Sequence, residues 1–259
     1  MSLEDVLGPA VPATYAALLG IEALRPARRW PQIRFWRLIG AAFFLVMGGR
    51  VAARPVLRPA AWIARHRLGD LGGLGVAGGF VVGYLGLTFV FYWFHRAEHA
   101  FDPFWRGLHQ LHHAPQRVDL SGFAFTHPAE MLATALITAA VTTLVFGIDP
   151  RAAALVGYVH AVASMVQHLN TPTPRWLSVV FQRPEAHGLH HERNIHHRNF
   201  GDLPLWDMIF GTYANPARFD GEDLSSVDTA PDRLTAALGG ACRGADLDGD
   251  GSVTSADAR

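Results

Sequence analysis

Long hydrophobic blocks separated by short polar segments run along this chain and predict membrane helices. Residues 71–94 carry no charged side chain, and a helix of this length, rising about 1.5 Å per residue, is longer than a hydrocarbon core of about 30 Å. Residues 131–148 and 152–170 also lack Asp, Glu, Lys and Arg, and the sequence GIDPR between them predicts a tight turn joining antiparallel helices. The pattern predicts an all-α fold, a multi-pass transmembrane helical bundle.

Two further apolar blocks lie nearer the N-terminus. Residues 6–21 are apolar although they contain Pro9 and Pro12, and no basic region precedes them. We therefore interpret them as a retained membrane segment and not as a cleaved signal peptide. Residues 38–49 are apolar for only twelve residues and span a membrane only by drawing in their flanks. With this block included, the chain has five predicted spans.

Arginines give conflicting signals about the orientation of these spans. With five spans, the arginine cluster at 25–37 shares a side of the membrane with residue 95, and the positive-inside rule makes that side cytoplasmic. The second cluster, at 50–67, then lies outside, against the rule. We favour the first cluster because the side chain of Arg50 can extend to the interface.

Glycines punctuate the longest apolar block. The sequence GLGVAG at 73–78 matches the dinucleotide-binding pattern G-x-G-x-x-G, but no strand precedes it, so we reject that interpretation. The four-residue spacing of Gly75, Gly79 and Gly83 instead predicts a flat helix face for close packing against another helix.

Composition agrees with a membrane protein. Of 259 residues, 50% are hydrophobic and 17% charged, and the formal net charge of zero gives no support for a nucleic-acid partner. The single cysteine, Cys242, excludes an internal disulfide and a Cys-rich metal site. We predict N-terminal membrane segments and Arg-rich loops over 1–70, a main domain over 71–213 that ends in a polar cap, and a loosely structured tail over 214–259.

Histidine is the unusual residue. The chain has 14, and all but His66 lie between residues 95 and 197. The motifs HRAEH (95–99), HQLHH (109–113) and HGLHH (187–191) each place imidazoles three or four residues apart, on one helix face. Neutral imidazole binds iron, zinc and copper. These motifs, with His168 at the end of an apolar block, exceed the three or four ligands of one zinc site, so two metal ions explain them best.

Carboxylate-based metal motifs are missing from the sequence. No Glu has a His three residues later, as carboxylate di-iron bundles require, and the zinc-protease motif H-E-x-x-H is absent. The predicted site is therefore almost entirely imidazole.

These motifs resemble those of the fatty acid hydroxylase/sterol desaturase superfamily of integral-membrane di-iron oxygenases. The stretch FYWFHRAEHAFDPFWRGLHQLHH is similar to its YWxHRxxH…LWxxHxxHH block, HPAE (127–130) to its HPxE element, and HGLHHERNIHHRNFGDLPLWDMIFGTY to its closing HxxHH…NYG…LxxWDxxFGTY block. The resemblance covers residues 20–213. It implies a cytoplasmic histidine-rich cap holding a dinuclear metal site.

Carried over residue by residue, the resemblance implies which residues bind the metals and which lie around them. The implied metal ligands are His95, His99, His109, His112, His113, His168, His187, His190 and His191. Assigned to the metals or to their surroundings are His127, His196, His197 and Glu130. Two positions depart from the family pattern: Thr88 stands where members often have Asp, and Phe125 where Arg often precedes HPxE.

The resemblance also implies the chemistry. Two iron ions would use O2 to hydroxylate or desaturate a membrane lipid, and zinc would compete for the same nitrogen ligands during purification. No flavin or nicotinamide motif occurs in the sequence, so the electrons are expected from a separate ferredoxin, cytochrome or reductase. The expected location is the cell membrane, with the active site facing the cytoplasm.

Three other interpretations stay open from the sequence. A His-rich membrane metal-binding or transport protein would place its ligands mid-helix, whereas here they follow the helix ends. A haem carrier would pair single histidines on facing helices. A family member that had lost activity would lack some motif histidines, and none is missing.

The C-terminal tail contains a calcium-loop pattern. The sequence DLDGDGSVTSAD (246–257) resembles an EF-hand or dockerin-type loop, with candidate Ca²⁺ ligands Asp246, Asp248, Asp250, Ser252 and Asp257. A single loop without a partner binds calcium weakly.

Overall fold

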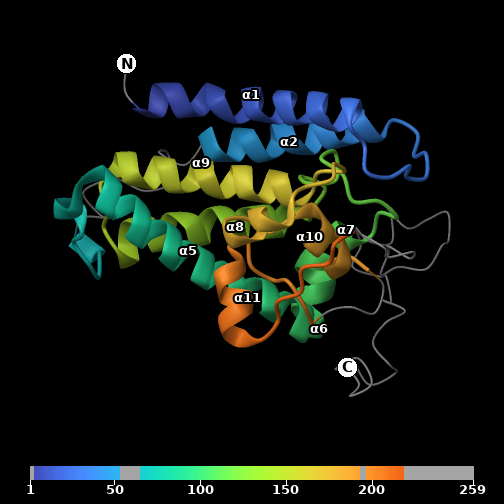
Figure 1. The fold of residues 1–259 in the computed structure, drawn as a ribbon. Coiled ribbons are helices and arrows are strands. Elements are labelled where there is room, and N and C mark those ends of the chain that lie inside the picture. Colours follow the sequence, from blue (N-terminus) through green and yellow to red (C-terminus); the bar gives the residue numbers. More distant parts are fainter. Residues whose placement is uncertain (1–2, 53–64, 193–196, 219–259) are drawn as a thin grey trace.

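Helices make up the regular structure of the part of the chain that the computed structural model describes, namely residues 3–52, 65–192 and 197–218. The longest are α1 (Leu3–Leu24), α2 (Trp36–Ala52), α5 (Gly75–Ala100), α8 (Pro128–Ala139) and α9 (Pro150–Gln167). Helix α9 packs against α1 and α5, and α2 contacts α8, so these helices form one bundle (Figure 1). The all-α prediction is confirmed.

Three of the predicted spans are long and apolar enough to cross a membrane. They are Val6–Leu24, Gly72–Ala100 and Pro128–Val145, with mean hydropathies of 1.3, 1.9 and 1.5. The apolar part of α2, Trp36–Gly48, is shorter. Helix α9 is not among the three, because Arg151, His160 and Gln167 lower the hydropathy of an 18-residue helix.

Glycines let α5 approach α9 closely, as the spacing predicted at two of three positions. A Cβ atom at Gly79 would lie 2.9 Å from the Cβ of Ala152, and one at Gly83 would lie 2.7 Å from Ile148. The prediction for Gly75 was wrong: with a φ of 64° it begins α5, and no neighbour lies within 4 Å of its Cβ position. Only glycine adopts that φ without strain.

Short helices gather at one end of the bundle (Figure 1). After α5 come α6 (Asp102–Phe104), the π-helix η2 (Trp105–His109) and α7 (Gln110–His113); the later ones are α10 (Pro184–His190) and α11 (Pro204–Phe210). Three single turns complete the described helices: η1 (Gly72–Leu74), η3 (Ala140–Val145) and η4 (Arg175–Val179). Single π-helical turns are frequent at functional sites.

Polar contacts hold α11 and its loop on α5. Asp207 accepts hydrogen bonds from the backbone N–H groups of Phe200 and Gly201, each at 2.8 Å. Trp206 donates its indole N–H to the hydroxyl of Thr88, 2.9 Å away, and Phe210 stacks on Tyr92. Thr88, which departs from the family pattern, therefore anchors the cap. Phe125, the other departure, packs against Trp36 and Phe43.

Candidate metal centre

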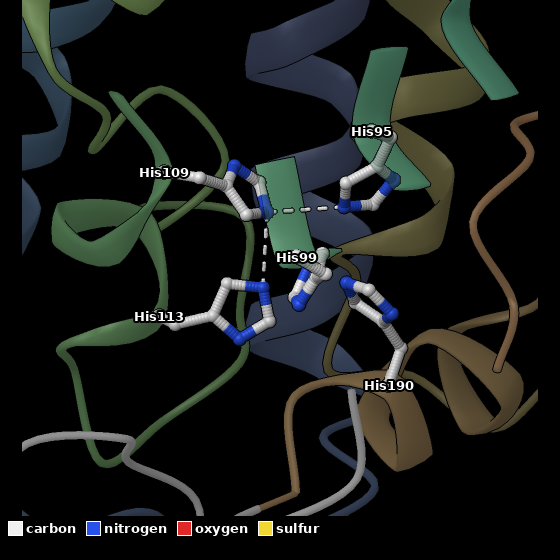
Figure 2. Close-up of side chains that lie close together, drawn as sticks. All are labelled: His95, His99, His109, His113 and His190. Atoms are coloured by element: carbon white, nitrogen blue, oxygen red, sulfur yellow. Dashed lines mark hydrogen bonds between the residues drawn. The ribbon is translucent and has the colours of Figure 1, made fainter. Parts of the chain in front are cut away.

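Two groups of histidines lie at the end of the bundle where the short helices gather. Group one contains His95, His99, His109, His113 and His190, and each offers a ring nitrogen within 4.8 Å of the others (Figure 2). Group two contains His112, His168, His187 and His191, which meet the same limit. The structure thus brings together all nine histidines that the sequence singled out as ligands. Their binding of metal stays a prediction.

Each group draws its rings from elements far apart in the sequence. Group one joins the last turns of α5 to η2, α7 and α10. Group two joins α7 and α10 to His168, the residue after α9. The adjacent residues His112 and His113 point into different groups, as do His190 and His191. This division explains the HxxHH spacing, because each doublet serves both groups.

Burial favours the neutral form of four of these rings. Within group two, His112 is 9% exposed and His187 is 2% exposed, and in group one His190 is fully buried. Burial lowers the pKa of His112, His113, His187 and His191 well below the usual value for imidazole, and the neighbouring rings lower it further. Neutral imidazole is the form that binds a metal ion.

The ring nitrogens that converge in group one carry lone pairs. His95 donates its Nδ1–H to the carbonyl of Phe200 and His109 donates its Nδ1–H to Glu130, both at 2.8 Å. A neutral ring that donates from Nδ1 has only a lone pair on Nε2. The Nε2 atoms of His95 and His109 nevertheless lie 3.0 Å apart, and that of His113 lies 3.1 Å from His109 (Figure 2). Such a cluster of lone pairs is stable around a cation.

Group two repeats this arrangement. His168 donates its Nδ1–H to the carbonyl of Ser164, 2.7 Å away. Its Nε2 lies 3.0 Å from the Nε2 atoms of His112 and His187, and His191 Nε2 is 3.0 Å from that of His187. Both groups therefore have the donor set that a transition-metal ion requires.

Two carboxylates lie beside group one. Glu130 Oε1 accepts from His109 Nδ1, and its other oxygen accepts from the hydroxyl of Thr126. Glu98 is 2% exposed, and its Oε2 lies 3.7 Å from the same nitrogen of His109. Sequence reasoning singled out Glu130 but missed Glu98, although Glu98 lies inside the motif HRAEH.

His127 and His197 are described by the structure and lie outside the two groups. His127 caps α8, accepting from the N–H of Ala129 at 3.2 Å. His197 accepts from the side chain of Arg198 at 3.1 Å. His196 lies outside the described residues, as do the five calcium-loop residues at 246–257.

A buried aspartate that sequence reasoning also missed lies next to the site. Asp202 contacts His160 Nδ1 at 2.7 Å and accepts from the side chain of Gln167 at 2.8 Å. His160 stacks on Phe91 of α5, with ring centroids 4.6 Å apart. A single Asp in a loop belongs to no spacing pattern, so its role could not be predicted from the sequence.

Comparison with known proteins supports the same region. The fatty acid hydroxylase family model matches residues 80–212, which contain all nine histidines. Human alkylglycerol monooxygenase is 32% identical over 136 residues, covering 50% of this chain and 29% of the relative. Ornithine lipid hydroxylase OlsE of Rhizobium tropici is 26% identical over 148 residues, covering 56% and 44%. Sphingolipid C4-hydroxylase sur2 of Schizosaccharomyces pombe is 27% identical over 129 residues, covering 48% and 44%.

The match with these relatives spans less than half of their length. No solved structure shows significant similarity to this chain.

Proposed function

The chain belongs to the fatty acid hydroxylase family, whose model matches half of its residues, and we propose that it is a membrane-bound di-iron oxygenase that hydroxylates or desaturates a lipid with O2. The observation that carries this proposal is the pair of buried groups of converging, neutral imidazoles. Group one and group two would each hold one iron ion. When bound, the two ions supply the oxidising power needed to break an unactivated C–H bond.

The protein itself orients the ligands and excludes water. Carbonyl groups of Phe200, Ser164 and Arg198 accept the Nδ1–H of His95, His168 and His190, which fixes the tautomer and direction of each ring. Because eight of the nine rings are buried and His95 is only partly exposed, a reactive centre there is shielded from bulk water.

The proposed substrate is a long-chain lipid that reaches the site from the bilayer. His95 and His99 lie in the last turns of the candidate span Gly72–Ala100, so the site lies at one end of the apolar bundle. Relatives named for alkylglycerols, ornithine lipids and sphingolipids support a lipid with a polar headgroup. Electrons would come from a separate donor, a ferredoxin, cytochrome or reductase.

We assign the site to the cytoplasmic side of the cell membrane. The backbone N–H of Arg28 donates to Asn170 at 3.0 Å, so the first arginine cluster lies on the same side as His168. The described part of the second cluster lies at the other end, where Leu68 N–H donates to the carbonyl of Leu144. Each cluster has five arginines. We favour a cytoplasmic cluster at 25–37 because the side chain of Arg50 can extend to the interface and because ferrous iron and reducing partners are cytoplasmic.

The test is lipid oxidation by iron-loaded protein in lipid nanodiscs, supplied with a chemical reductant and isotopically labelled O2. Hydroxylation adds one labelled oxygen to a lipid, and desaturation removes two hydrogens, so mass spectrometry separates them. The matched control is His190→Ala, which removes one group-one ring. A wild-type protein that binds iron yet leaves every lipid unchanged would refute the proposal and favour a metal-binding or transport protein.

A further inference from the structure

Asp202 connects the loop before α11 to three consecutive turns of α9. Its carboxylate contacts His160 Nδ1 at 2.7 Å, Gln167 Nε2 at 2.8 Å and Ser164 Oγ at 3.4 Å. These three residues are spaced i, i+4, i+7 and share one face of the helix. With 9% of its surface exposed, Asp202 is a buried carboxylate whose two oxygens both have partners on α9.

The α9 side of this contact leads directly to group two. Ser164 donates its hydroxyl to Asp202, and its carbonyl accepts the Nδ1–H of His168 at 2.7 Å. Gln167, which donates its side-chain N–H to Asp202 at 2.8 Å, directly precedes His168 in the chain. A shift of this last turn would therefore rotate the His168 ring.

The loop side of the contact leads to group one. Phe200, two residues before Asp202, accepts the Nδ1–H of His95 with its carbonyl at 2.8 Å. The carbonyl of Asp202 itself accepts from the N–H of Gln182 at 3.0 Å, just before α10. Asn199 has a φ of 57° and bonds Ala186 and Ala214 through its side chain, which fixes the start of this loop.

We propose that Asp202, held by His160, is a positioning residue that sets the geometry of both histidine groups together. It ties the loop that orients His95 to the turn of α9 that orients His168. His160 completes the link, since its ring stacks on Phe91 of α5, the helix that carries His95. This inference rests on the proposed function for the identity of the metal. The connection that Asp202 makes between its loop and α9 does not depend on that function.

The first experiment compares Asp202→Asn with Asp149→Asn. Asp149 is the N-cap of α9, at the other end of the same helix, where it accepts from the N–H of Arg151 at 2.8 Å. Asp149→Asn therefore controls for the loss of a carboxylate that contacts α9. We expect Asp202→Asn to weaken iron binding by roughly 10- to 100-fold, as for other residues that orient metal ligands. Its Mössbauer spectrum should differ from wild type for both irons, while that of Asp149→Asn should not.

A second pair of variants keeps the proposal testable if Asp202→Asn fails to fold. His160→Phe preserves the ring that stacks on Phe91 but removes the nitrogen that contacts Asp202, whereas His160→Asn places a side-chain nitrogen near the position of the lost Nδ1. We expect weakened iron binding and an altered spectrum in His160→Phe, and partial recovery of both in His160→Asn.

Unchanged iron affinity and spectra in Asp202→Asn, or equal spectra in the two His160 variants, would overturn the inference. That outcome would leave the proposed function standing. Conversely, a wild-type protein that binds two irons without oxidising lipid would fail the proposed function, while the spectra would still report on Asp202.

Discussion

Replacing Glu130 with Gln should weaken metal binding by about tenfold. In the structure, Glu130 accepts the Nδ1–H of His109 at 2.8 Å. A hydrogen bond to a charged group contributes about 1.5–3 kcal/mol and one between neutral groups about 0.5–1.5 kcal/mol. Glu130→Gln keeps the size and an acceptor oxygen but removes the charge, so the loss is roughly 1–1.5 kcal/mol, or about tenfold in affinity.

Glu130→Ala should have a larger effect than Glu130→Gln. His109 is 3% exposed, so its N–H would lose its acceptor in a buried place, at a cost of about 1–3 kcal/mol. Glu98 cannot replace the acceptor without moving, because its oxygen is 3.7 Å from that nitrogen.

Competition with a chromogenic chelator measures this affinity. The control is Asp102→Asn, which removes a half-exposed carboxylate paired with Arg106 at 2.7 Å and should change nothing measurable. Wild-type affinity in Glu130→Gln, or an equal loss in Asp102→Asn, would refute the orienting role of Glu130.

Further predictions concern the ligands, the tail and the membrane orientation. His112→Ala should lose the iron of group two first and His190→Ala that of group one, both with loss of lipid oxidation; full activity in either would remove that residue from the site. A chain that ends at Arg218 should keep its metal and activity. A chain that ends at Asn215 lacks the carbonyl of Pro216, which the buried Arg183 contacts at 3.0 Å, and should therefore have a lower melting temperature. Labelling of Cys242 by a membrane-impermeant thiol reagent in intact cells should fail; efficient labelling would place the C-terminus outside. Because the pKa values of the group-two rings His112, His187 and His191 are lowered, the neutral, metal-binding form persists at acidity that protonates ordinary imidazoles; iron content measured after dialysis should therefore hold as pH falls to about 5.5. Loss of iron near pH 6.5 would contradict this.

The sequence alone predicted the histidines of the candidate site, but not all of the residues that surround and orient them. Spacing of three and four residues brings imidazoles onto one face, and the structure places those rings in two groups. Glu98 and Asp202 escaped notice because an isolated carboxylate has no periodicity, and its role depends on what tertiary packing places beside it. The division of His112 and His113 between groups likewise depends on tertiary packing, which brings His99 of α5 to His113 and His168 at the end of α9 to His112.

The sequence predicted the membrane helices, which depend on composition, but not the features that depend on local backbone geometry. The apolar run of α5 was recognisable, and Gly79 and Gly83 lie against neighbouring side chains as their spacing predicted. Gly75 belongs to the helix start, a distinction of backbone angle that spacing does not encode. The π-helix at Trp105–His109 was not predicted from the sequence.

Iron content and Mössbauer spectroscopy of anaerobically loaded protein test the central claim most directly. The arrangement predicts about two iron ions per chain, one for each histidine group, without haem absorbance. Removal of a group-two ring should leave one of the two spectral components. A single iron per chain, or two irons that survive the loss of both His112 and His190, would contradict the assignment of these histidines as a dinuclear centre.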